Sequence, residues 1–105
     1  MKKIIFAYIT AKNKSEAKKI GKALVKERLC ACVNIFPEMN SIYWWKGKIE
    51  NANEAVLIAK TTKQLFSKLS ARVKELHSYE CPCILQLEVT DGNKEYMNWL
   101  LESVK

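Results

Sequence analysis

All four cysteines of the chain fall in two Cys-x-Cys pairs, and the only histidine lies close to the second pair. The pairs are Cys30 with Cys32 and Cys81 with Cys83, and the histidine is His77. Residues i and i+2 of a β-strand point to the same side of a sheet, so two such thiols could converge on one ion. Thiolates suit Cu(I) and Zn(II). The pairs are therefore compatible with soft-metal chemistry, although structural zinc sites usually separate their cysteines by about two to four residues.

Each of these residues also has a plainer interpretation, and the sequence leaves both open. A buried free cysteine behaves as a small hydrophobic side chain. His77 directly follows Leu76, the last apolar residue of a predicted helix, where an imidazole can interact with the helix C-terminus. A neutral imidazole is equally a common metal ligand. A disulfide within either cysteine pair is not expected, because the ring would be too tight.

The helices and strands that must position these residues are predicted from two kinds of hydrophobic repeat along the sequence. Apolar and alternating runs predict strands over residues 3–10, 31–35, 41–46, 55–61 and 84–89. Helical spacing of apolar residues predicts helices over about 13–28, 61–76 and 96–104. The order is β-α-β-β-α-β followed by a terminal helix. This order is typical of a ferredoxin-like α+β fold with an antiparallel sheet.

Local signals refine the predicted helices. Asn13 stands three residues before Glu16, which is the spacing of a capping box at a helix start. Thr61 and Gln64 repeat this spacing and predict a second capping box. Gly21 lies in the middle of the first helix, where glycine costs about 1 kcal/mol relative to alanine. Its presence favours close packing of that helix against a neighbour.

The stretch 31–51 is longer than one ordinary strand, and Pro37 interrupts it. We therefore predict an extended hairpin that projects beyond the sheet. Trp44 and Trp45 fall within it, and aromatic residues are enriched in the cores of protein interfaces. This predicts self-association through the hairpin. RNA binding is not favoured, because the predicted strand 55–60 offers no ring on which a base could stack.

Length and composition narrow the remaining possibilities. The 105 residues predict one domain, residues 1–105, with 49% apolar and 28% charged residues. No apolar run reaches the roughly 18 residues of a membrane span. The apolar N-terminal stretch is better explained as a first strand than as a signal peptide. These observations predict a cytoplasmic protein with no membrane partner.

Charge and motif content argue against two further classes of protein. The net charge of +7 would suit nucleic acid, but many of the basic residues follow the polar faces of two predicted helices and form no single patch. We therefore expect no nucleic-acid partner. The chain has no glycine-rich phosphate loop and no nucleophile with an obvious base and orienting acid. The sequence thus predicts a binding protein and not an enzyme.

A set of motifs spreads over nearly the whole chain. Its members are Leu24-Val25, Leu29, Ala31-Cys32-Val33-Asn34-Ile35, Pro37, Ser41, Tyr43, Trp45, Gly47, Ile49-Glu50, Glu54, Lys60-Thr61-Thr62, His77, Tyr79-Glu80, Pro82, Ile84, Gly92-Asn93, Tyr96 and Trp99-Leu100. Together these motifs resemble the signature of the CutA-type divalent-cation tolerance proteins. The resemblance implies a ferredoxin-like homotrimer, similar in structure to PII-type signalling trimers. It also implies a role in tolerance to copper and other divalent metals.

Candidate metal ligands follow from the resemblance. Cys32 matches the family cysteine in the Ala-Cys-Val-Asn motif, and His77 matches the histidine that opens the His-x-Tyr-Glu motif. Glu80, which closes that motif, is a third candidate. We expect binding of copper or another divalent metal at or near clefts between subunits, with no obligatory cofactor. The alternative is a PII-like sensor whose clefts bind a small anionic ligand, which the basic charge balance would favour.

Three of the cysteines depart from the family pattern. Cys30 stands where the family usually has a small residue, and Cys81 and Cys83 flank Pro82 where other residue types are usual. These thiols add soft ligands that a family site would not have. We expect all three to be dispensable for folding, because alanine in place of a buried cysteine leaves only a small cavity.

Overall fold

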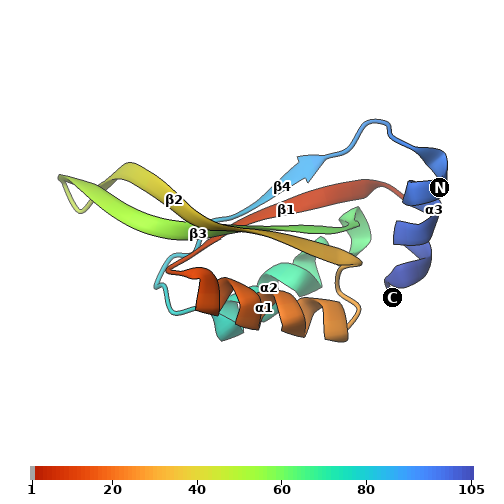
Figure 1. Ribbon diagram of the computed structural model, residues 1–105, viewed down its shortest axis with the longest axis horizontal. Helices are drawn as coiled ribbons and strands as arrows, with labels where there is room; N and C mark the ends of the chain where they lie inside the picture. Colours follow the sequence, from red (N-terminus) through yellow and green to blue (C-terminus); the bar gives the residue numbers. More distant parts are fainter. Residues whose placement is uncertain (1) are drawn as a thin grey trace.

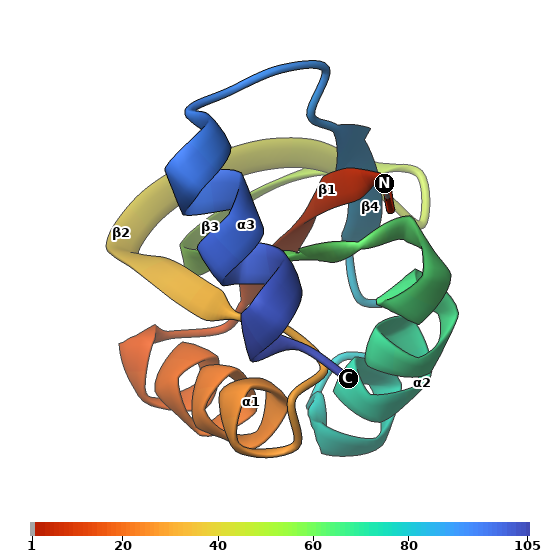
Figure 2. The same cartoon turned by 90° about the vertical axis from the view of Figure 1, so that its right-hand side faces the viewer.

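The computed structural model describes residues 2–105, in which helices cover one face of a four-stranded sheet (Figure 1, Figure 2). All strand pairs are antiparallel, and the strand order is β2-β3-β1-β4. The elements are β1 (Ile4–Ala11), α1 (Lys14–Lys26), β2 (Cys32–Trp45), β3 (Lys48–Thr62), the 3₁₀ turn η1 (Lys63–Leu65), α2 (Phe66–Leu76), β4 (Ile84–Glu88) and α3 (Lys94–Ser103). This arrangement confirms the predicted ferredoxin-like α+β fold, with an extended hairpin and a C-terminal helix.

The hydrophobic core lies between the sheet and helices α1 and α2. Ile5, Ala7 and Ile9 alternate along β1 and are fully buried on this face. Leu24 of α1 and Leu69 of α2 belong to the same buried cluster. Burial of a large aliphatic side chain contributes about 1.5–3 kcal/mol relative to its exposure. The period-2 pattern of β1 and the period-3.6 stripes of the helices therefore meet in one core, as predicted.

Helix α1 begins at the predicted capping residue. The Asn13 side chain accepts a hydrogen bond from the Glu16 N–H at 2.9 Å. The Glu16 carboxylate accepts from the Lys12 N–H at 2.9 Å, one residue before the position that a capping box would use. The helix ends at Lys26, two residues earlier than predicted, because Arg28 adopts a left-handed conformation with φ of 58°.

The second predicted capping box is wrong. Thr61 still belongs to β3 and faces the core, where its hydroxyl donates to the Leu29 carbonyl oxygen at 2.6 Å. η1 begins at Lys63, and Thr62 before it makes no side-chain cap. Strand pairing opposite Ile5 therefore holds Thr61 in the sheet, and its side chain is not available to a helix N-terminus.

The β2–β3 hairpin is longer and more continuous than predicted. The two predicted segments 31–35 and 41–46 form one strand of 14 residues, because Pro37 sits in a register shift between Phe36 and Met39. A bulge of this kind tolerates proline within a strand. At the tip, Lys46 and Gly47 both have positive φ, as a two-residue type I′ turn requires. The hairpin projects beyond the sheet, as expected (Figure 1).

Gly21 marks a close approach between α1 and β2. A Cβ atom at this position would lie 3.1 Å from Cγ1 of Val33. Glycine at this position lowers the helix propensity of α1, but its missing side chain allows a shorter distance between helix and sheet. This confirms the close packing expected from a glycine inside the helix.

The opposite, outer face of the sheet is largely uncovered in the described chain. Phe36, Leu85 and Leu87 point to this face and are 54%, 58% and 50% exposed. α3 reaches one end of it, where Lys60 Nζ donates to the Tyr96 hydroxyl at 3.2 Å. A broad apolar surface of this kind is typical of a protein–protein interface.

Candidate functional site

A cleft of about 740 Å³ opens where the β2–β3 hairpin leaves the rest of the sheet. Its walls come from the hairpin, from the end of β1 and from the segment 77–83 that joins α2 to β4. The lining residues are Tyr8, Thr10, Met39, Ser41, Ile42, Tyr43, Trp45, Glu54, Ser78, Tyr79, Glu80, Cys81 and Cys83. Aromatic and sulfur-bearing side chains predominate, and the only charged side chains among these residues are two carboxylates.

The His77 side chain links the start of the segment 77–83 to β1 through a hydrogen bond. Its side chain is 0% exposed, and Nε2 lies 2.6 Å from the carbonyl oxygen of Thr10. The Tyr79 N–H donates to Nδ1 at 3.1 Å. A carbonyl only accepts, so Nε2 is the donor of this bond, while Nδ1 is the acceptor for the Tyr79 N–H. Both ring nitrogens are therefore engaged within the subunit, and the imidazole does not cap α2.

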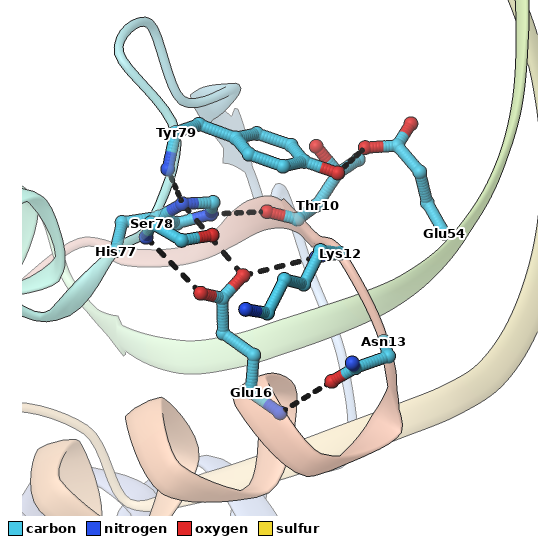
Figure 3. A network of polar contacts seen from close by, with 8 residues as sticks. All are labelled: Thr10, Lys12, Asn13, Glu16, Glu54, His77, Ser78 and Tyr79. Atoms are coloured by element: carbon cyan, nitrogen blue, oxygen red, sulfur yellow. Dashed lines mark hydrogen bonds and ion pairs between the residues drawn. The ribbon is translucent and has the colours of Figure 1, made fainter.

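Glu16 holds the same segment to the start of α1 (Figure 3). Its Oε2 accepts from the Ser78 N–H at 3.0 Å, while Oε1 accepts from the Lys12 N–H and lies 3.8 Å from His77 Nδ1. Burial alone would raise the pKa of the Glu16 carboxyl. The hydrogen bonds from Lys12 and Ser78 stabilise its charged form, and the resulting pKa is lower than usual.

Tyr79 reaches across the cleft to β3. Its hydroxyl donates to Oε2 of Glu54 at 2.7 Å (Figure 3). Burial and the adjacent Glu54 carboxylate both raise the pKa of Tyr79, so it remains a neutral donor. The segment 77–83 is thus tied to β1, α1 and β3 by three side chains, and this fixes one wall of the cleft.

The buried Cys30 and the half-buried Cys83 are both in their thiol form at neutral pH. Burial, with a smaller contribution from Cys32, raises the pKa of Cys30 to about 12. Burial and then the neighbouring Glu54 carboxylate raise the pKa of Cys83. A thiol is neither a strong nucleophile nor a good metal ligand until it loses its proton. Cys81, in contrast, is exposed at the mouth of the cleft.

Cys32 and His77 lie in separate parts of the subunit. Cys32 is on the outer face of β2 opposite Lys60, which itself pairs with Phe6 of β1. His77 contacts Thr10, four residues further along β1 than Phe6. At about 3.4 Å per residue, this offset alone amounts to roughly 14 Å. One subunit therefore does not place Cys32 and His77 around a shared ion.

The remaining metal candidates are also dispersed. Glu80 lines the cleft and is exposed. Cys30 precedes β2 and is buried in the core, whereas Cys32 is on the outer face, so this Cys-x-Cys pair does not converge. Within residues 2–105, no group of three or more His, Cys, Asp or Glu side chains is arranged to hold a metal ion. A site built from the predicted ligands would need donors from more than one subunit.

Sequence reasoning assigned no role to Glu54. The residue follows the polar run Glu50-Asn51-Ala52-Asn53, which resembles an exposed turn, yet it is only 9% exposed. Its contact with Tyr79 joins residues 25 positions apart. The alternation of side chains along a strand indicates which face of β3 carries Glu54. It does not indicate which side chain from a distant segment contacts Glu54.

The family model of the CutA1 divalent ion tolerance protein matches residues 5–103 of the chain. The divalent-cation tolerance protein CutA of Archaeoglobus fulgidus is 45% identical over 100 residues, which cover 95% of this chain and 97% of the relative. The protein of the same name from Thermus thermophilus is 48% identical over 95 residues, covering 90% and 92%. The similarity therefore spans nearly the full length of both relatives.

Solved structures show the same fold. The crystal structure of CutA1 from Oryza sativa superposes with a TM-score of 0.95 at 38% identity, covering 98% of this chain and 94% of that one. The structure of the periplasmic divalent cation tolerance protein CutA from Archaeoglobus fulgidus gives a TM-score of 0.94 at 43% identity, covering 97% and 99%. The hairpin and the terminal helix are thus included in the similarity.

These relatives contradict the predicted cytoplasmic location. The Archaeoglobus fulgidus protein of known structure is described as periplasmic, and relatives from Oryza sativa and Arabidopsis thaliana are named as chloroplastic. The prediction rested on composition and on the first strand, and neither carries information about compartment. Among residues 2–105, no helix has the length and apolar character needed to cross a membrane.

The motifs along the chain, the ferredoxin-like sheet with its extended hairpin, and the similarity to full-length relatives all point the same way. The family model covers all but a few residues at either end. Relatives above 40% identity and structures with TM-scores above 0.9 cover the same range. The chain belongs to the CutA1 divalent ion tolerance protein family.

Proposed function

We propose that this chain acts in divalent-cation tolerance as a homotrimer, each subunit being one domain over residues 1–105. The observation that supports assembly is the uncovered outer face of the sheet, where Phe36, Leu85 and Leu87 are exposed. The hairpin adds Trp44, which is 72% exposed. Large exposed apolar surfaces favour association, because burial contributes roughly 25 cal/mol per Å². A hairpin that extends past its own sheet can cover the outer face of a neighbour.

The proposed activity is reversible binding of copper or another divalent metal at or near clefts between subunits. One subunit does not supply a complete donor set among residues 2–105, so the proposal requires donors from two copies. Cys32 and Glu80 are accessible donors on different parts of the surface. His77 could contribute only after its ring leaves Thr10 and Tyr79. The metal is the bound ligand in this proposal, and no resident cofactor is needed.

A binding role without catalysis agrees with the chemistry of the cleft. Cys83 is held as a thiol by burial and by Glu54, and it is therefore a weak nucleophile. The nearest imidazole, that of His77, has both nitrogens engaged in hydrogen bonds with the backbone. Neither group is poised for nucleophilic or general-base work.

Cation binding is better supported than the PII-like alternative of a small anionic ligand. The charged residues that line the cleft are Glu54 and Glu80, and the lining includes no lysine or arginine. An anion in this cleft would meet carboxylates of the same sign, which disfavours its binding. The positive net charge of the chain therefore does not extend to this cleft.

The assembly can be tested by sedimentation. We expect the protein to sediment as a trimer at micromolar concentration. If a partner buries the Trp45 ring, Trp45→Ala should weaken the trimer by several kcal/mol, in the range of about 3–5 kcal/mol for a buried tryptophan. Lys18→Ala on the exposed side of α1, away from the outer face of the sheet, serves as a control with little expected effect. A parent protein that stays monomeric would refute the trimer.

The metal role can be tested by calorimetric titration of the reduced protein with Cu(I), Cu(II) and Zn(II). We expect Cys32→Ser and Glu80→Gln each to weaken binding at least tenfold, which corresponds to about 1.4 kcal/mol. Glu102→Gln on the exposed side of α3 is the matched control. Affinities that are unchanged in both variants would remove these residues from the site. A thermal midpoint raised by phosphate but not by metals would favour the anion-binding alternative.

A further inference from the structure

Glu54 carries a buried negative charge that has no cationic partner in the described chain. Its side chain lines the cleft, and the residue is only 9% exposed. Among residues 2–105 its carboxylate forms no ion pair with a lysine, arginine or histidine. Its one side-chain hydrogen bond is the bond that Oε2 accepts from Tyr79, a neutral donor. A buried carboxylate is normally stabilised by a cation or by several donors, so this charge is incompletely compensated.

The second carboxylate oxygen of Glu54 faces the cleft. Every fully buried side-chain oxygen or nitrogen in residues 2–105 has a hydrogen-bond partner. Oε1 of Glu54 has none, so it is not fully enclosed and can be reached from the cleft. A ligand entering the cleft would therefore find an accessible charged acceptor at Glu54, in addition to the exposed carboxylate of Glu80.

The walls around this acceptor are apolar and aromatic. Met39 lies directly opposite Glu54 in the β2–β3 pairing, and the Tyr8 hydroxyl donates to its Sδ at 3.7 Å. Tyr43, further along the hairpin, lines the same cleft. A volume of about 740 Å³ lies within the range of about 300–1,000 Å³ typical of small-molecule sites. The cleft thus combines one buried charge with a large apolar surface.

This combination suits an organic cation better than a bare metal ion. A metal ion needs several donors, and within residues 2–105 no three His, Cys, Asp or Glu side chains are grouped to supply them. An ammonium group needs only one carboxylate, and aromatic rings stabilise it further through cation–π attraction. The apolar body attached to such a group would cover the remaining wall and exclude water.

We propose that the cleft binds a small organic ammonium compound, with its cationic head against Glu54 and its apolar body against Tyr8, Met39 and Tyr43. The cleft also contains Glu80, one of the metal donors proposed above, so the experiment below uses metal-free protein and treats metal binding as a distinguishable outcome. Tyr79 acts as a positioning residue, because its hydroxyl holds the Glu54 carboxylate in place from the opposite wall.

Calorimetric titration of the metal-free, reduced protein in its native assembly tests the proposal. The probes are benzylammonium and benzyl alcohol, which have nearly the same shape and differ in charge. We expect benzylammonium to bind and to raise the thermal midpoint, and benzyl alcohol to bind at least tenfold more weakly. This comparison uses only the parent protein and does not depend on any variant.

Two variants locate the charge. Glu54→Gln keeps an oxygen that can accept from Tyr79 but removes the charge, and we expect it to lose benzylammonium binding at least tenfold. Glu50→Gln, exposed on the same strand and outside the cleft, should bind as the parent does. Sedimentation of Glu54→Gln should show an unchanged assembly.

Several outcomes would overturn the proposal. Equal binding of benzyl alcohol would show that the charge is irrelevant, and unchanged binding by Glu54→Gln would place the cation elsewhere. No benzylammonium binding combined with Zn²⁺ binding that Glu54→Gln abolishes would assign Glu54 to a metal site. Dissociation of the assembly in Glu54→Gln without any benzylammonium binding to the parent would show that a neighbouring subunit supplies the missing cation.

Discussion

The two faces of the sheet differ in how completely the chain's own helices cover them. On the helix-covered face, Ile5, Ile9 and Leu57 are fully buried between the sheet and α1 and α2. On the outer face, Leu85 and Leu87 of β4 remain about half exposed, and only one end of the face is approached by α3. Both faces are apolar, but within residues 2–105 only one of them is covered by helices. The difference teaches that the sequence encodes a buried core and, separately, an apolar surface that stays exposed in the described chain.

The largest expected effect comes from removing a side chain on the covered face. Leu57→Ala should lower the free energy of unfolding by about 2–5 kcal/mol, because a fully buried leucine leaves a cavity. Leu85→Ala on the outer face should cost less than about 0.5 kcal/mol in protein dilute enough to sediment as a monomer. Urea denaturation of both variants measures the contrast. Equal losses in monomeric protein would mean that the outer face is covered within the chain.

The next largest loss of stability is expected from breaking a buried polar contact on the covered face. Thr61→Val keeps the shape of the side chain but removes the donor that the Leu29 carbonyl uses. We expect a loss of about 1–3 kcal/mol in the free energy of unfolding, measured by denaturant. Thr90→Val, at an exposed position, is the control and should change stability little. A neutral result at Thr61 would mean that another donor replaces the hydroxyl.

A smaller effect is expected at the carboxylate that ties the segment 77–83 to α1. Because the pKa of Glu16 in the folded protein is lowered, its ionised form contributes stability above the ordinary pKa of about 4.3. This contribution should be lost as the pH falls through the folded pKa. Urea midpoints of the parent and Glu16→Gln should therefore differ at pH 7 and converge as the pH falls below the lowered folded pKa. A gap that persists at low pH would exclude this explanation.

The smallest effect is expected where α1 touches β2. Gly21→Ala should gain helix propensity but crowd Val33, leaving a net loss below about 1 kcal/mol. In a Val33→Ala background the same change should stabilise the protein by up to about 1 kcal/mol, because the crowding is gone. A double-mutant cycle in urea measures this reversal. Additive effects would show that Gly21 and Val33 do not limit the approach of the helix.

Local periodicity was sufficient to predict the covered face and the order of elements. Alternation along β1 and the apolar stripes of the helices report which side of each element is buried, since these periods follow directly from backbone geometry. The cap at Asn13 was equally readable, because donor and acceptor are three residues apart. The capping box predicted at Thr61 failed for the opposite reason. Its partner, the Leu29 carbonyl, is 32 positions away, and strand pairing outweighed the local signal.

The candidate site depended on contacts that no local pattern reports. Cys32 and His77 both stand out in the sequence, yet strand register places them on separate parts of the subunit. Glu54 and Tyr79 stand out less, yet the path of the segment 77–83 brings them to 2.7 Å. A short repeat specifies which face of an element is buried, whereas register and loop path decide which distant side chains meet. The cleft, and the Glu54 carboxylate that forms no ion pair among residues 2–105, therefore depend on how the strands are assembled in space.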